Sequence, residues 1–215
     1  MQTVVANTRS DTLYTKNGIP VLFYKIETPS FSSNCSQQAV EKINAFYEAL
    51  AKEKEAYCRT ELYSQASEDA QYIRDNEPAF QRYEYLMNYH ITLNRGCVVS
   101  LYREEYSYLG GAHGMTVRTS ESWDFTDGKK ITLKELLGGS GYEGRVKQWI
   151  KKQIAENLKT PNPIYFEDYK KNVETSFRSD NFYLTPDHII VFFQQYDIAP
   201  YVAGITEFRL PRDIN

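Results

Sequence analysis

Glycine is distributed very unevenly along this 215-residue chain. Ten of the eleven glycines lie at or beyond Gly96, and only Gly18 precedes it. Glycine marks tight turns because it adopts positive φ angles without steric cost. The distribution therefore predicts long, uninterrupted elements in the first half of the chain and shorter, turn-rich elements in the second half.

The N-terminal segment has the pattern of a β-hairpin. Two candidate strands, residues 10–17 and 19–27, flank the dipeptide Asn17-Gly18, which favours the positive φ angles of a tight hairpin turn. In residues 21–26, hydrophobic side chains occur at odd and at even positions, that is, on both faces of a strand. At least one face of the second strand is therefore expected to be buried.

A long helical pattern follows the hairpin. Asn34 or Ser36 can cap the helix, and apolar residues then recur at spacings of three and four up to about Arg74. Pro78 ends the segment. Within it, the run at 52–55 alternates in sign and predicts a solvated face.

The remaining chain mixes strands and short helices without regular alternation. Strands are expected at about 80–93, 97–108 and 114–125. Shorter elements are predicted farther along: a helical turn capped by Thr132, helices near 146–158 and 166–177, a hairpin over 182–194, and a last strand at 206–210. This pattern favours an α+β fold with antiparallel sheets, a long N-terminal helix and shorter C-terminal helices. We expect two closely associated small domains, residues 1–112 and 113–215.

Composition narrows the function classes. Apolar residues make up 41% and charged residues 25% of the chain, which is typical of a globular protein. The net charge of −3 does not favour a nucleic-acid binder, which normally carries a basic excess. The longest wholly apolar runs are about five residues, far below the roughly 20 that a membrane helix needs.

Cysteine and histidine are scarce. The three cysteines, Cys35, Cys58 and Cys97, contain no C-x-x-C spacing, so no zinc ribbon or thioredoxin-like motif is expected, and no metal or cofactor is predicted. One disulfide is possible between any two of them, and three buried thiols are an equally good alternative. The N-terminus lacks the basic and apolar regions of a signal peptide.

One segment fits a phosphate-binding pattern in sequence but not in context. Residues 139–144 match G-x-G-x-x-G, a motif that must follow a buried strand. The preceding residues 133–137 read as helical, so we interpret the segment as a helix–helix connection. Ser140 does not form a nucleophile elbow, because Tyr142 stands where that motif needs glycine.

The histidines offer one candidate for chemistry. His90 lies in a strand pattern and His188 opens a strand beside a turn, so both are expected to be structural. His113 lies in Tyr-Leu-Gly-Gly-Ala-His-Gly, residues 108–114, where three glycines permit close backbone approach. His113 can bind a ligand, coordinate a metal or stabilise the turn.

Tyrosine is abundant, with 18 residues, and its amphipathic side chain suits core edges and binding surfaces alike. In the segment 192–204, Pro200 prevents a regular central strand and Gly204 permits a bend. Tyr196 and Tyr201 of this segment are available for packing or for binding.

Two motifs together resemble a known tandem-domain region. Tyr108-Leu-Gly-Gly-Ala-His-Gly114 resembles a Y-x-G-G-A-H-G signature, and Phe192-x-x-x-Tyr-x-Ile-Ala-Pro-Tyr-x-x-Gly204 resembles the C-terminal signature of the same region. The region occurs outside the cytoplasm in the anti-sigma factor RsiV and as a non-catalytic part of the peptidoglycan deacetylase PdaC. Its two domains resemble residues 10–108 and 115–210 of this chain.

The resemblance implies a non-enzymatic, extracytoplasmic sensor or binding domain. In RsiV this region binds lysozyme, so a lysozyme-like protein or a cell-wall glycan is the expected partner. The sequence lacks a deacetylase domain, a sigma-binding segment and a transmembrane helix. We therefore expect a secreted or membrane-anchored protein whose leader or anchor lies outside this sequence.

Two alternatives remain open. One is a cell-wall hydrolase, or its accessory domain, that uses His113 and a nearby carboxylate as general acid and base. The other is a purely structural module, which predicts no pocket with convergent polar groups. The candidate binding residues come from the two signatures: Tyr108, Gly110, Gly111, His113, Tyr196 and Tyr201.

Overall fold

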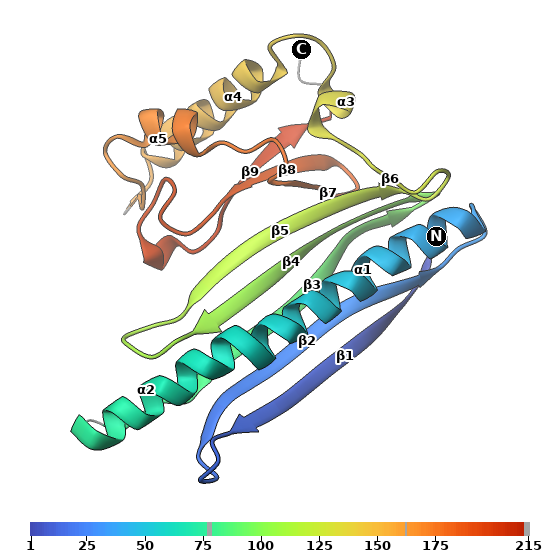
Figure 1. The fold of residues 1–215 in the computed structure, drawn as a ribbon. Coiled ribbons are helices and arrows are strands. Elements are labelled where there is room, and N and C mark those ends of the chain that lie inside the picture. Colours follow the sequence, from blue (N-terminus) through green and yellow to red (C-terminus); the bar gives the residue numbers. More distant parts are fainter. Residues whose placement is uncertain (77–78, 162, 213–215) are drawn as a thin grey trace. The chain divides into compact units, whose positions relative to one another are not determined.

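The computed structural model describes residues 1–76, 79–161 and 163–212 and has the expected α+β architecture (Figure 1). Its strands are β1 (Thr3–Tyr14), β2 (Pro20–Ser32), β3 (Tyr83–Arg95), β4 (Val98–Tyr108), β5 (Met115–Asp124), β6 (Lys129–Lys130), β7 (Phe182–Leu184), β8 (His188–Phe193) and β9 (Thr206–Pro211). Its helices are α1 (Gln37–Tyr57), α2 (Tyr63–Asn76), α3 (Leu133–Leu137), α4 (Tyr142–Asn157) and α5 (Tyr169–Ser176), with a π-helical segment η1 (Cys58–Leu62) and a 3₁₀ turn η2 (Tyr201–Ala203).

Two sheets contain these strands. Strands β1 to β6 form one sheet in chain order, and β7, β8 and β9 form the other. The sequence predicts antiparallel pairing, and β1/β2, β5/β6, β7/β8 and β8/β9 pair in that way. Strands β2 and β3 instead pair in parallel, with Leu22 opposite Tyr83. A parallel pair needs a long crossover connection, which α1, η1 and α2 provide.

The chain forms two compact units. The first unit contains Gln2–Tyr89 and Arg103–Thr116, and the second contains Met1, His90–Tyr102 and Val117–Asn215. The division into domains at residue 112 stays a prediction.

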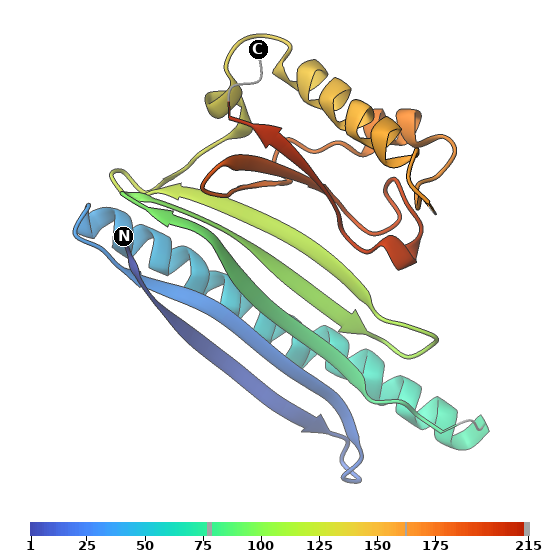
Figure 2. The ribbon, with the colours of Figure 1, turned by 180° about the vertical axis from the view of Figure 1, so that it is seen from behind.

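The core of the first unit lies between β2 and the long helix. Val40, Ile43 and Tyr47, which form the predicted helical stripe, are buried, as are Leu22 and Ile26 of β2. Figure 2 shows α1 running along the strands of this unit. The apolar periodicity of the helix therefore packs against the alternating apolar face of β2.

The long helix begins and continues largely as the sequence predicts. The hydroxyl of Ser36 accepts a hydrogen bond from the backbone N–H of Ala39, and the helical path runs through η1 to Asn76. The charged run differs from the expected solvated face, because Lys54 and Glu55 are half-buried. Lys54 forms an ion pair of 2.8 Å with Glu105 on β4.

The predicted hairpin is present but longer than expected. Gly18 has the expected positive φ, +77°, but Asn17 does not have one. The strands are therefore joined by a loop over residues 15–19 and not by the expected two-residue turn. Strand β1 begins at Thr3, although the sequence indicates a strand only from residue 10. The additional residues are mostly exposed, since β1 pairs with β2 alone. Their apolar members, Val4, Val5 and Ala6, follow one another directly, so they show no apolar alternation.

In the second unit, α4 and α5 cover the sheet β7–β9 (Figure 2). Val146, Ile150 and Ile154 of α4 pack in one cluster with Phe193 of β8 and Phe208 of β9. The G-x-G-x-x-G segment, residues 139–144, contains the end of the α3–α4 connection and the first residues of α4, in agreement with the interpretation as a helix–helix connection. The predicted cap is also confirmed: Thr132 and Glu135 form a reciprocal capping box at the start of α3.

The cysteines divide into two kinds. Cys35 and Cys97 are disulfide-bonded, whereas Cys58 is a free, fully buried thiol. Burial raises the pKa of the Cys58 thiol to about 12, so it is protonated and unreactive at neutral pH.

Candidate functional site

The glycine-rich loop between β4 and β5 is shaped by its own backbone and by Tyr108. Gly110 and Gly111 have φ angles of +81° and +92°, which side chains larger than hydrogen rarely adopt. The Tyr108 hydroxyl lies 3.0 Å from the carbonyl oxygen of Gly111, to which it donates, and it also contacts Oε1 of Gln81. These three signature residues therefore set the conformation of the loop.

The last glycine of the signature is required by a close contact. A Cβ atom on Gly114 would lie 2.4 Å from the ring of Tyr106. Such a distance is far inside van der Waals contact, so any side chain at this position displaces the ring. Gly114 is thus a packing residue.

His113 lies at the surface of the same loop. Its Nδ1 lies 3.0 Å from the carbonyl oxygen of Gly114, and the residue is exposed. A carbonyl oxygen only accepts, so this contact favours the tautomer with the proton on Nδ1. Of the three roles that the sequence leaves open for His113, the backbone contact supports the one in which the side chain stabilises the turn.

The C-terminal signature forms a tight turn after β8. The backbone N–H of Asp197 donates to the carbonyl of Gln194 at 3.2 Å, and the Asp197 carboxylate accepts from the N–H of Gln194 at 2.8 Å. Tyr196, within this turn, has a φ of +67°. This left-handed conformation is uncommon for an aromatic residue and marks a position held by its surroundings.

The tail signature combines buried and exposed residues. Ile198 and Ala199 are buried and serve packing. The rings of Tyr196 and Tyr201 lie with their centroids 5.9 Å apart, while 48% of Tyr196 and 76% of Val202 remain exposed. Residues 194–202 therefore expose two apolar side chains, Tyr196 and Val202, on an ordered backbone.

Arg118 is bonded to Gln194, the first residue of this turn. The Gln194 side chain bonds to the backbone N–H and carbonyl of Arg118. The buried guanidinium of Arg118 lies 4.1 Å from the ring centroid of Tyr102 and 5.6 Å from that of Phe192, and it pairs with Glu207. Because this cation is removed from water, its attraction to the aromatic faces is strong and holds the guanidinium and the two rings in place.

The predicted site residues thus fall into two groups. Tyr108, Gly110, Gly111 and His113 belong to the first unit, and Tyr196 and Tyr201 belong to the second. His90, expected to be structural, is exposed on β3, and its ring centroid lies 4.9 Å from that of Tyr102.

The sequence reading missed a groove in the first unit. This groove of about 800 Å³ lies between the β1–β2 turn and α2, and is lined by Thr15, Lys16, Asn17, Tyr63, Ser64, Ser67, Glu68, Gln71 and Tyr72. The signal lay in the polar and aromatic residues of α2 that recur at helical spacing, residues 64, 67–68 and 71–72. The apolar periodicity of this helix describes only its opposite, packed face.

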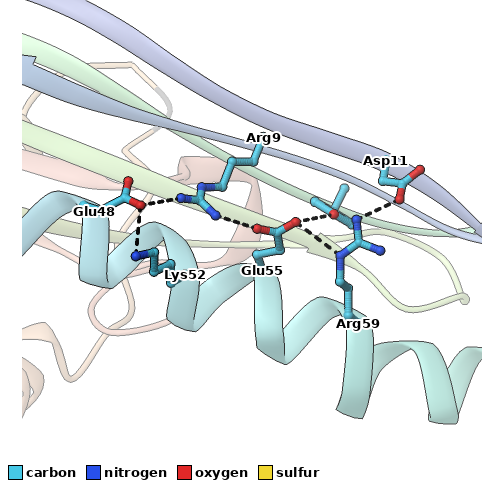
Figure 3. A network of polar contacts seen from close by, with 7 residues as sticks. Arg9, Asp11, Glu48, Lys52, Glu55 and Arg59 are labelled. Carbon is cyan, nitrogen blue, oxygen red and sulfur yellow. Dashed lines mark hydrogen bonds and ion pairs between the residues drawn. The ribbon is translucent and has the colours of Figure 1, made fainter.

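A charged network joins β1 to α1 in the first unit (Figure 3). Arg9 binds Glu48 and Glu55 at 2.7 Å each, and Glu55 also accepts from Arg59 and Tyr24. Hydrogen bonds from Arg9 lower the pKa of both glutamates, so they are ionised at neutral pH. A general acid needs a protonated carboxyl, so this network does not supply one.

Among the described residues, no group of three or more histidine, cysteine or acidic side chains has the geometry of a metal site. No helix in the described part of the chain is long and apolar enough to span a membrane.

Family models match both halves of the chain. Residues 16–116 match the model described as deacetylase PdaC, and residues 134–213 match the model described as a protein of unknown function, DUF3298. The chain is 33% identical over 88 residues to the anti-sigma-V factor RsiV of Bacillus subtilis (strain 168), covering 39% of this chain and 31% of RsiV. It is 24% identical over 227 residues to the peptidoglycan-N-acetylmuramic acid deacetylase PdaC of the same strain, covering 99% of this chain and 44% of PdaC.

These matches confirm the resemblance that the two signatures indicate. The chain spans less than half the length of either curated relative. Crystal structures show the same fold: a DUF3298 family member from Bacteroides fragilis superposes with a TM-score of 0.73 at 16% identity, and one from Pseudomonas aeruginosa with 0.61 at 17% identity. Each alignment covers 98% of this chain and 90% of the other.

Proposed function

We propose that this chain is a non-enzymatic, extracytoplasmic binding domain of a bacterial envelope protein, and that its ligand is a lysozyme-like protein. It is related over most of its length to part of a peptidoglycan deacetylase and over a shorter stretch to an anti-sigma factor. The disulfide-bonded state of Cys35 and Cys97 supports the location, because disulfides persist in oxidising compartments.

One observation carries the binding role: the two exposed apolar side chains of residues 194–202, the segment that we call the tail turn. Tyr196 and Val202 are well exposed there, although the buried Ile198 between them anchors the backbone. Tyrosine on a rigid turn is a common anchor in protein interfaces, because it buries a large ring at low entropic cost. Leu109 and Met115, 40% and 37% exposed beside the glycine-rich loop, are the corresponding candidates in the first unit.

Charge supports a basic partner. The chain carries a net charge of −3 at pH 7, with 28 acidic residues against 25 lysines and arginines. Opposite net charge accelerates encounter between two proteins and makes association weaker at high salt. A lysozyme-like protein of basic composition fits this preference.

Variants of the tail turn test the proposal. Tyr196→Asn removes the ring but keeps a residue that tolerates positive φ, and Tyr196→Phe retains the ring. In a calorimetric titration with hen egg-white lysozyme, we expect Tyr196→Asn to weaken binding about tenfold or more and Tyr196→Phe to bind nearly as well as the unmodified chain.

The control is Leu158→Ala, an exposed apolar residue after α4 and outside both signatures. It is expected to leave lysozyme binding unchanged. Equal affinities for all four chains would contradict a role for the tail turn in binding.

A further inference from the structure

The groove between the β1–β2 turn and α2 has a rigid frame. In the turn, the Thr15 hydroxyl accepts from the N–H of Ile19 at 3.1 Å, and the N–H of Gly18 donates to the carbonyl of Thr15 at 3.0 Å. Across the groove, the Tyr63 hydroxyl donates to the carbonyl of Tyr14 at 2.9 Å. This bond ties α2 to the end of β1, so the groove is formed before any ligand arrives.

The lining favours a neutral, hydroxyl-rich ligand. It combines two tyrosine rings with hydroxyl and amide groups from both walls. Its lysine and its glutamate, Lys16 and Glu68, carry opposite charges, so the lining has no formal net charge. The volume of about 800 Å³ lies within the range typical of small-molecule sites.

Tyr72 has the properties of a stacking platform. It is 70% exposed on the last part of α2 whose side chains are described, and it lines the groove. Its exposed ring offers a flat apolar face with a polar edge. The apolar face of a sugar ring and its outer hydroxyls match that combination.

Ser67 supplies an independent sign of a missing partner. Its Oγ is buried and has no hydrogen-bond partner within the described part of the chain. A serine inside a helix ordinarily satisfies its hydroxyl by bonding back to the preceding turn. A buried hydroxyl without a partner is costly, and rotation about χ1 toward a ligand in the groove removes that cost.

We propose that this groove binds an oligosaccharide, with Tyr72 stacking on a sugar ring and Ser67, Asn17 and Lys16 bonding to its polar groups. The site lies in the first unit and does not depend on lysozyme binding by the tail turn. The sequence leaves a cell-wall glycan open as a partner, and the groove is a defined place on the molecule for it.

The test uses the N-acetylglucosamine trimer as the probe. Titration of the full chain, followed by the chemical shifts of backbone amides, is expected to show saturable binding in the millimolar range or tighter, with shifts at residues 15–17 and 63–72. Tyr72→Ala is expected to weaken binding about tenfold, and Tyr72→Phe to restore most of it. Ser67→Ala is expected to weaken binding severalfold.

Tyr14→Ala is the matched control. Tyr14 is an equally large, 54% exposed tyrosine whose side chain does not line the groove. Its backbone carbonyl, which accepts from Tyr63, is kept in the variant, so removal of the ring is expected to leave the affinity unchanged. Absence of saturable shifts, or equal affinity of the Tyr72→Ala chain and the unmodified chain, overturns the proposal. Thermal unfolding of each variant verifies that the fold is retained.

The same variants separate this site from the proposed function. Tyr72→Ala is expected to bind lysozyme normally, and Tyr196→Asn to bind the trimer normally. Failure of lysozyme binding with retained trimer binding overturns the tail-turn proposal alone, and the reverse result overturns the groove alone.

Discussion

The Gln194 side chain bonds to the backbone of Arg118 in the manner of a neighbouring strand. Its Oε1 accepts from the Arg118 N–H at 2.9 Å, and its Nε2 donates to the Arg118 carbonyl at 2.6 Å. One amide side chain therefore satisfies both polar backbone groups of a buried residue and fixes the start of the tail turn.

Gln194→Ala is expected to lower the free energy of unfolding by about 1–3 kcal/mol, because two buried backbone groups lose their partner. Urea unfolding followed by circular dichroism measures this change. Gln37→Ala, an exposed glutamine at the start of α1, is the control and is expected to stay within about 0.5 kcal/mol of the unmodified chain. Equal stability of the two variants would contradict the bridging role.

Gly114→Ala is expected to destabilise the fold by about 1–3 kcal/mol, because the new Cβ meets the Tyr106 ring. Gly144→Ala is the matched control: it lies exposed in α4 with no atom within 4 Å of an added Cβ. There alanine is expected to stabilise the helix by about 0.5–1 kcal/mol. The two variants therefore shift the midpoint of thermal unfolding in opposite directions, and shifts of the same sign would contradict this account.

The thiols are expected to react in a fixed order. With a maleimide reagent at pH 7, the native chain stays unlabelled, because Cys58 is buried with a raised pKa of about 12 and the other two cysteines are disulfide-bonded. Denaturation without reductant exposes one thiol, and reduction then exposes three. Mass spectrometry counts the labels, and more than one label before reduction would disprove the disulfide.

The network around Glu55 predicts a defined loss of stability in acid. Hydrogen bonds from Arg9 and Tyr24 lower the pKa of this carboxyl below its ordinary value of 4.5. A carboxylate with a lowered folded-state pKa contributes stability above that ordinary value, and the contribution is lost as the pH falls through the folded-state pKa.

Glu55→Gln is therefore expected to be less stable than the unmodified chain at pH 7, with the difference shrinking as the pH falls below about 4.5. Thermal unfolding of both chains across pH 3–7 measures the difference. Lys52, which pairs with the exposed Glu48, offers a control: Lys52→Gln is expected to change stability little at any pH. A constant difference between the Glu55→Gln and unmodified chains would contradict the linkage.

Much of the fold could be predicted from the sequence because its signals are local. The reversal at Gly18, the cap at Ser36 and the cap at Thr132 are each determined by a few neighbouring residues, and all three are present, although the loop around Gly18 is longer than a two-residue turn. The parallel pairing of β2 with β3 could not be predicted in this way. It depends on where a long helix returns the chain, which no local pattern records.

In the candidate site, too, the features that depend on neighbouring residues could be predicted and the others could not. The glycines at 110, 111 and 114 were recognisable as turn or close-approach positions, and the structure gives each a steric reason. The positive φ of Tyr196 was not visible, because nothing in its own residue type demands it. The groove beside Tyr72 was missed because its walls come from two segments almost fifty residues apart.

The most direct test of the central claim is calorimetric titration of the full chain with hen egg-white lysozyme at low and at physiological salt. A binding domain with an exposed aromatic turn and a net acidic charge predicts saturable one-to-one binding, with a Kd of about 10 μM or tighter that weakens as salt is added. No measurable binding at several hundred micromolar of either protein, roughly a Kd beyond the millimolar range, would contradict it.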